Sequence, residues 1–77
     1  MKDAAKRRLA ANRVVQPDGT ELVTAVVEMS GIDVTSVSHL EKETHSTEWI
    51  GGRIELRHGH DGRIHAFKDG KMLGMAT

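Results

Sequence analysis

Residues 51–70 read Gly-Gly-Arg-Ile-Glu-Leu-Arg-His-Gly-His-Asp-Gly-Arg-Ile-His-Ala-Phe-Lys-Asp-Gly, and this stretch decides the fold. Two short runs, 53–57 and 63–68, alternate or nearly alternate apolar with polar residues between glycine-rich turns. Alternation at period two is typical of a half-buried strand, and Asp61-Gly62 between two such runs is a strong hairpin signal. The stretch therefore predicts an antiparallel β-hairpin.

The length of the turn sets the register of this hairpin. A two-residue type I′ turn at Asp61-Gly62 places His58 opposite His65, and Leu56 then shares its face with Phe67. A three-residue loop with a bulge at Gly62 would instead place Ile64 and Ala66 on the face of Leu56. We expect the first register, because it separates an apolar face from a charged one.

Three further strands are predicted upstream of the hairpin. Residues 13–16 are short and β-branched, and the turn residues Pro17-Asp18-Gly19-Thr20 follow them. Residues 21–29 form the longest strand candidate and carry apolar side chains on both faces, which is typical of a central, covered strand. Residues 32–40 resume the pattern after Ser30-Gly31.

The whole chain predicts a mainly β fold. We expect five or six antiparallel strands in a meander, ending at a short strand over 72–73, that form a small barrel or a strongly twisted sheet. Residues 41–48 contain no apolar side chain and predict a long solvated loop. The alanine-rich residues 1–11 predict a flexible or short helical leader, and residues 12–77 a single small β domain.

Composition excludes several classes of protein. The chain has 77 residues and no cysteine, so disulfides and thiolate zinc sites are excluded. Its 11 basic and 11 acidic residues cancel, which gives no general attraction to nucleic acid or to anionic membranes. No run of apolar residues approaches the roughly 20 needed to span a bilayer, and no signal peptide is evident. We therefore expect a cytoplasmic protein.

The histidines are the first candidates for chemistry. Neutral imidazole is a common metal ligand, and the predicted register makes His58 and His65 cross-strand neighbours that could share a zinc or nickel ion. His60, Asp61 or the loop residue His45 would supply the third ligand. The competing interpretation is that these are polar residues at a hairpin end. We favour the second interpretation, which predicts no metal and no cofactor.

Other motifs give weaker signals. The adjacent pairs Ser38-His39 and His45-Ser46 do not form a nucleophile–base pair, because neighbours on a strand point to opposite faces. The glycines of 51–62 precede no helix and do not predict a phosphate site. The basic cluster Lys6-Arg7-Arg8 has no aromatic residues for base stacking. We therefore predict no catalytic residue and no enzyme activity.

Several short motifs resemble parts of known proteins. Asn12-Arg13-Val14-Val15 together with Val26-Val27-Glu28 resembles the opening of the small N-terminal β-domain of amidohydrolases. The core Thr47-Glu48-Trp49-Ile50-Gly51-Gly52 is similar to that of short uncharacterised bacterial proteins. His58-Gly59-His60 resembles the His-x-His of an amidohydrolase metal site, but the barrel that supplies the other ligands is absent. The resemblance implies a β fold without a transferable activity.

These observations predict a small β module for interaction or self-association, most simply a homodimer. The two-sided strand over 21–29 leaves Leu22 and Val26 in need of a cover, which a second copy would provide. The alternative is that Leu9 covers this face within one chain. Trp49 is expected to be buried; if it is exposed, it becomes the best candidate for a binding hot spot. The alternative is a metal-binding protein or metal-dependent hydrolase that uses the hairpin histidines.

Overall fold

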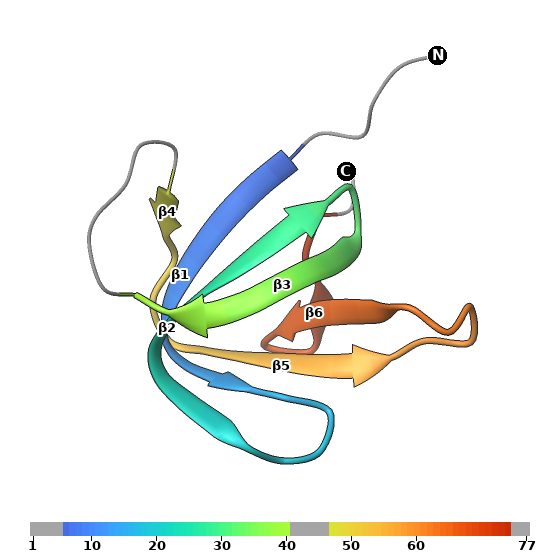
Figure 1. The fold of residues 1–77 in the computed structure, drawn as a ribbon, viewed down its shortest axis with the longest axis horizontal. Helices are drawn as coiled ribbons and strands as arrows, with labels where there is room; N and C mark the ends of the chain where they lie inside the picture. Colours follow the sequence, from blue (N-terminus) through green and yellow to red (C-terminus); the bar gives the residue numbers. More distant parts are fainter. Residues whose placement is uncertain (1–5, 41–46, 75–77) are drawn as a thin grey trace.

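The computed structural model describes residues 6–40 and 47–74, which form one mixed sheet without a helix (Figure 1). The strands are, in chain order, β1 (Lys6–Val15), β2 (Glu21–Ser30), β3 (Asp33–His39), β4 (Thr47–Trp49), β5 (Arg53–His58), β6 (Ile64–Lys68) and β7 (Lys71–Met72). The prediction of a mainly β fold is confirmed. The described residues contain no helix long and apolar enough to cross a membrane.

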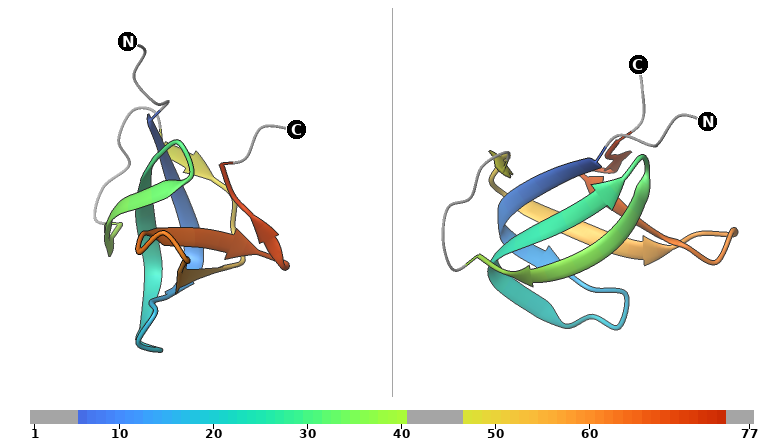
Figure 2. Two further views of the ribbon diagram at one scale, coloured as in Figure 1. Left: turned by 90° about the vertical axis from the view of Figure 1, so that its right-hand side faces the viewer. Right: turned by 45° about the horizontal axis from the view of Figure 1, so that its top comes forward.

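The strand order is β3-β2-β1-β5-β6-β7, with β4 paired to β1. Two antiparallel meanders, β1–β2–β3 and β5–β6–β7, therefore meet at β1, where β4 and β5 both pair in parallel (Figure 2). A purely antiparallel meander was predicted, and that part of the prediction is wrong. Local turn signals predict pairing only between strands that follow one another in the sequence. Strand β1 instead pairs with β4 and β5, which lie more than thirty residues away.

The N-terminal segment is a strand and not a helix from Lys6 onward. Leu9, Ala11 and Val14 of β1 are fully buried in the core. Alanine favours a helix in isolation, but partners on both sides of β1 supply the hydrogen bonds and the burial that override this preference. The predicted helical leader is therefore wrong for residues 6–11; residues 1–5 lie outside the described part of the chain.

The β5–β6 hairpin adopts the register with the longer loop. The backbone N–H of Gly59 donates to the carbonyl of Arg63 at 2.8 Å, and Gly62 has a φ of +77°, as expected for a three-residue loop with a glycine in the left-handed region. Leu56 consequently pairs with Ala66, and the predicted pairing of His58 with His65 is wrong by one residue. A shift of one residue moves every side chain of β6 to the opposite face.

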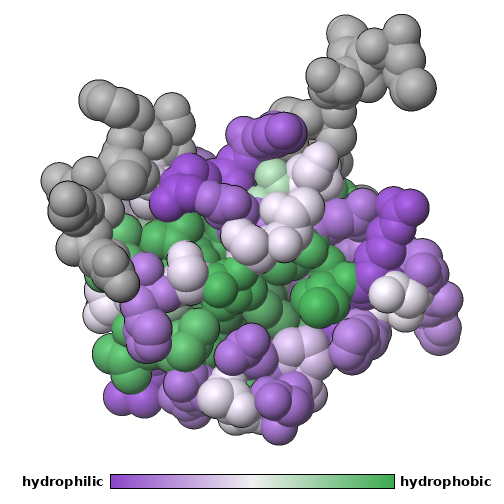
Figure 3. Space-filling view, in the orientation of Figure 1, coloured by the Kyte–Doolittle hydropathy of each residue, from purple (hydrophilic) through white to green (hydrophobic). Residues whose placement is uncertain are grey.

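The core lies inside the curved sheet and draws on both meanders. Its fully buried large side chains include Leu9, Val14, Met29 and Ile54. Strand β2 is covered on both faces within the chain, since Val26 is only 2% exposed and Val27 is fully buried. Figure 3 shows a band of hydrophobic residues across the middle of one face, surrounded by hydrophilic ones.

The sheet is not closed into a barrel, because no ladder of hydrogen bonds joins β3 to β6 or β7 among the described residues. The two ends of the sheet nevertheless approach each other, with β3 beside β6. A Cβ atom placed on Gly74 would lie 2.6 Å from the carbonyl oxygen of Gly31, so the chain after β7 packs against the β2–β3 turn. The structure is a curved sheet with a seam between β3 and β6.

Candidate functional site

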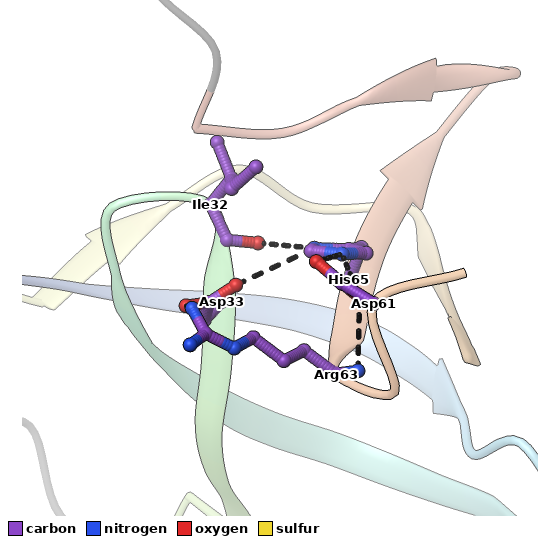
Figure 4. Close-up of polar contacts among 5 residues, drawn as sticks. All are labelled: Ile32, Asp33, Asp61, Arg63 and His65. Atoms are coloured by element: carbon purple, nitrogen blue, oxygen red, sulfur yellow. Dashed lines mark hydrogen bonds and ion pairs between the residues drawn. The ribbon is translucent and has the colours of Figure 1, made fainter. Parts of the chain in front are cut away.

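A cluster of polar side chains lies across the seam, centred on His65 of β6 (Figure 4). His65 is only 5% exposed, and both of its ring nitrogens have partners. Nδ1 is 2.8 Å from the backbone carbonyl of Ile32, in the β2–β3 turn, and Nε2 is 3.1 Å from Oδ2 of Asp61, in the β5–β6 loop. The imidazole thus joins three separate segments of the chain.

Asp33 and Arg63 complete the cluster. Oδ1 of Asp33 lies 3.8 Å from Nδ1 of His65, and Oδ2 of Asp33 accepts a hydrogen bond from the guanidinium of Arg63 at 2.8 Å. The carboxylate of Asp61 also accepts the backbone N–H of Arg63 at 2.9 Å, which is the hydrogen bond of an Asx turn. The loop and the imidazole therefore hold Asp61 in one orientation.

Both partners of the His65 ring are acceptors. A backbone carbonyl cannot donate a hydrogen bond, and neither can an ionised carboxylate, so the two contacts together favour the protonated ring, which can donate from both nitrogens. The hydrogen bond to the Ile32 carbonyl raises the pKa of His65, and Asp61 and Asp33 raise it further, against the opposing effect of burial. The backbone N–H of Arg63 lowers the pKa of Asp61, and His65 lowers it further.

These two pKa shifts predict how stability depends on pH. A raised pKa in the folded state means that the contribution of His65 is complete below its unfolded value of 6.5 and is lost as the pH rises through the folded value. A lowered pKa means that the contribution of Asp61 is complete above 3.8 and is lost as the pH falls through the folded value. The pair therefore stabilises the fold most between about pH 4 and 6.5.

We expect the melting temperature of the protein to fall as the pH rises above about 6.5 and His65 loses a proton. His65→Gln removes the titrating group and should remove this part of the slope. Thermal unfolding followed by circular dichroism in a series of buffers gives the melting temperature of the wild type and of the variant at each pH. If the two melting temperatures depended on pH with the same slope, His65 would not be the group responsible.

A pocket opens beside this cluster. Its volume is about 490 Å³, and it is lined by the apolar residues Ile32, Phe67 and Met72 together with His65 and Asp61. The guanidinium of Arg57 lies 5.2 Å from the centre of the Phe67 ring and forms part of the lining. A volume of this size suits a small ligand.

The three predicted histidines all line this pocket, but only His65 is buried. His58 and His60 are exposed, and both line the pocket with His65. Among residues 6–40 and 47–74, three residues form a group of potential metal ligands: Asp33, Asp61 and His65. Their ligand atoms lie within 4.8 Å of one another. His45 lies outside the described residues. Sequence reasoning named Asp61 and His65 but missed Asp33, which is distant in sequence.

The predicted binding residues are in different environments. Trp49 is 56% exposed on β4, so the expectation that it is buried in the core is wrong. Leu22 is half-buried and packs against the core, and Val26 is buried. The basic cluster is divided between the two faces of β1: Arg7 pairs with Glu48 at 2.8 Å, and Arg8 pairs with Glu28.

No protein-family model, no curated protein and no solved structure gives a significant match to this chain. The resemblance to the small β-domain of amidohydrolases therefore stays a prediction. The function has to be argued from the residues and their geometry.

Proposed function

We propose that the protein is a small, non-catalytic β module that self-associates through the edge of β4, with Trp49 as the central contact. One observation carries the proposal: the largest apolar side chain of an aromatic-poor chain is 56% exposed on an edge strand. Exposed tryptophan is costly to leave in water and is among the residues most enriched at binding hot spots.

The position of β4 in the sheet supports this edge over the others. The end strand β3 lies at the seam beside β6, where the His65 cluster joins them, and the chain after β7 approaches the β2–β3 turn at Gly31. Strand β4 pairs only with β1 in the sheet order and lies apart from the seam (Figure 1). An edge of this kind can accept a strand from another chain.

The surroundings of Trp49 combine buried apolar residues with a polar row. In the sheet register Trp49 lies beside Ala10 and, one strand further, Val26, which are both buried. The neighbouring row on the same face runs from Arg8 to Glu28 and Ser36 across three strands. The carboxylate of Glu28 accepts hydrogen bonds from both Arg8 and Ser36. Trp49 is therefore an isolated aromatic contact with a polar rim, which is the usual composition of an interface centre and its border.

A second copy of the chain is the occupant that these features favour. A two-fold axis beside β4 would pair the two edge strands antiparallel and bring the two Trp49 side chains into one contact. The formal net charge of zero means that two copies do not repel each other strongly. The proposal requires no cofactor and no chemistry at the interface.

Trp49→Ala is expected to weaken self-association at least about tenfold while lowering the free energy of unfolding by clearly less than the roughly 3–5 kcal/mol that a fully buried tryptophan costs, because more than half of the side chain is exposed. Sedimentation velocity across a micromolar concentration series measures the first effect, and thermal unfolding at the lowest concentration measures the second. Val23→Ala removes another exposed apolar side chain, 58% exposed on β2, and serves as the matched control.

The proposal would be contradicted if the wild-type chain sedimented as a monomer at every concentration. It would also be contradicted if Val23→Ala weakened association as much as Trp49→Ala. A large loss of stability in Trp49→Ala would instead show that Trp49 is part of the core.

A further inference from the structure

We propose that His65 and Asp61 form the core of a binding site for Zn²⁺ or a similar transition-metal ion, completed by His60 and by water at the same pocket. The inference goes beyond self-association and concerns the opposite part of the sheet. It is carried by the orientation of the His65 ring, by the separation of two ligand atoms and by the residues that line the pocket.

The orientation of the His65 ring is that of a metal ligand. A histidine that binds a metal through one nitrogen almost always donates its other N–H to a carbonyl or carboxylate, which fixes the tautomer. Nδ1 of His65 is 2.8 Å from the carbonyl oxygen of Ile32, and the ring is buried. Nε2 is left to face the carboxylate of Asp61, and both of these residues line the pocket.

The separation of the two ligand atoms fits one tetrahedral ion. Zinc lies about 2.0–2.1 Å from histidine nitrogen and carboxylate oxygen, so two such ligands at a tetrahedral angle are about 3.3 Å apart. Nε2 of His65 is 3.1 Å from Oδ2 and 3.2 Å from Oδ1 of Asp61. An ion can therefore replace the proton between the two groups with small movements of the loop.

Asp33 belongs to the surroundings of the site and not to its ligands. Its Oδ1 lies on the Nδ1 side of the ring, where the Ile32 carbonyl already occupies the direction of the nitrogen, and its Oδ2 is held by Arg63. The negative charge of Asp33 offsets part of the positive charge of the ion and of Arg63. Asp33 therefore acts as a positioning residue.

The remaining ligands come from the pocket. His60 is exposed and lines the same pocket as His65. His58 pairs with Ile64 and therefore lies on the opposite face of the hairpin from His65. The ring of His60 lies outside the group of ligand atoms within 4.8 Å of one another, so its side chain has to turn toward Asp61. His60 and a water molecule would then complete four ligands, which is the usual number for zinc. With one or two imidazoles and a single carboxylate, the donor set is suited to zinc, nickel or copper and poorly suited to Ca²⁺ or Mg²⁺, which require mainly oxygen ligands.

Binding exchanges a proton for the ion. When Nε2 carries a proton, its N–H bond breaks, the proton passes to buffer, and the nitrogen lone pair binds the metal without any change of oxidation state. Metal binding should consequently weaken as the pH falls.

Isothermal titration of Zn²⁺ into the full chain without a histidine tag tests the site. We expect one ion per chain. Ca²⁺ and Mg²⁺ should give no saturable signal. The absence of saturable zinc binding would overturn the proposal.

Variants identify the ligands. Asp61→Asn can still accept the hydrogen bond from the backbone of Arg63, so the loop is retained while affinity for Zn²⁺ should fall more than tenfold. His65→Gln should abolish binding. His39→Gln, an exposed histidine on the edge strand β3, is the matched control and should bind as the wild type does.

Asp33→Asn tests whether Asp33 positions the site or is itself a ligand. We expect this variant to lose less affinity for Zn²⁺ than Asp61→Asn does. A complete loss of zinc binding in Asp33→Asn alone would contradict the assignment. Because Asp61 is exposed, its variant remains folded and informative even if His65→Gln unfolds. Wild-type affinity in Asp61→Asn would overturn the site.

Discussion

Leu9→Ala is expected to lower the free energy of unfolding by about 2–5 kcal/mol, the cost of deleting a fully buried leucine and leaving a cavity. Leu9 is 0% exposed and is one of the largest fully buried side chains of the described residues. It lies opposite Val27 of β2, inside the curve of the sheet. For a domain of 77 residues this loss is a large fraction of the total stability.

Chemical denaturation measures this effect, with Lys6→Ala as the control because Lys6 is an exposed residue of the same strand. The control should change the free energy of unfolding by less than about 0.5 kcal/mol. If Leu9→Ala were as mild as Lys6→Ala, residues 6–11 would not belong to the core, and the original prediction of a leader would be correct.

Gly59→Ala is expected to destabilise the protein by about 1–3 kcal/mol through overpacking. A Cβ atom at this position would lie 2.7 Å from Cδ2 of His65 and 2.9 Å from Oδ1 of Asp61. The imidazole is buried and hydrogen-bonded on both sides, so it cannot move away without losing a partner. The cost therefore comes from a contact and not from an unusual backbone conformation.

The double variant Gly59→Ala/His65→Ala tests this cause. Truncating His65 removes the atoms that the new methyl group would meet, so the two substitutions together should cost less than the sum of their separate effects. Denaturant unfolding of the three variants provides the comparison. Strictly additive losses would mean that the contact with His65 is not the source of the destabilisation.

The sequence was most informative where structure depends on neighbouring residues. The turn at residues 17–20 forms as expected: Gly19 donates to the carbonyl of Gln16, and Thr20 donates to the side chain of Asp18. The breaks at Gly31 and Gly62 follow the same logic, because both have a positive φ that glycine adopts at low cost. Five of the predicted strands lie close to observed ones for this reason.

The candidate site was predictable only in part. His65 and Asp61 are four residues apart in one hairpin, so the sequence could place them together. Asp33 and the Ile32 carbonyl contact them from another hairpin, across a seam that no local sequence pattern predicts. The length of the turn decided which face His65 occupies, and the sequence permitted both lengths.

By itself, then, the sequence determined the β character of the chain and the places where strands are interrupted, because turn chemistry and alternation act over a few residues. Tertiary structure alone decided that the alanine-rich segment is a strand, since its partners β2, β4 and β5 supply hydrogen bonds and burial worth more than its helix preference. It also decided that Trp49 is exposed. A side chain at the end of an edge strand is buried only if another element covers it, and coverage is a property of the whole fold.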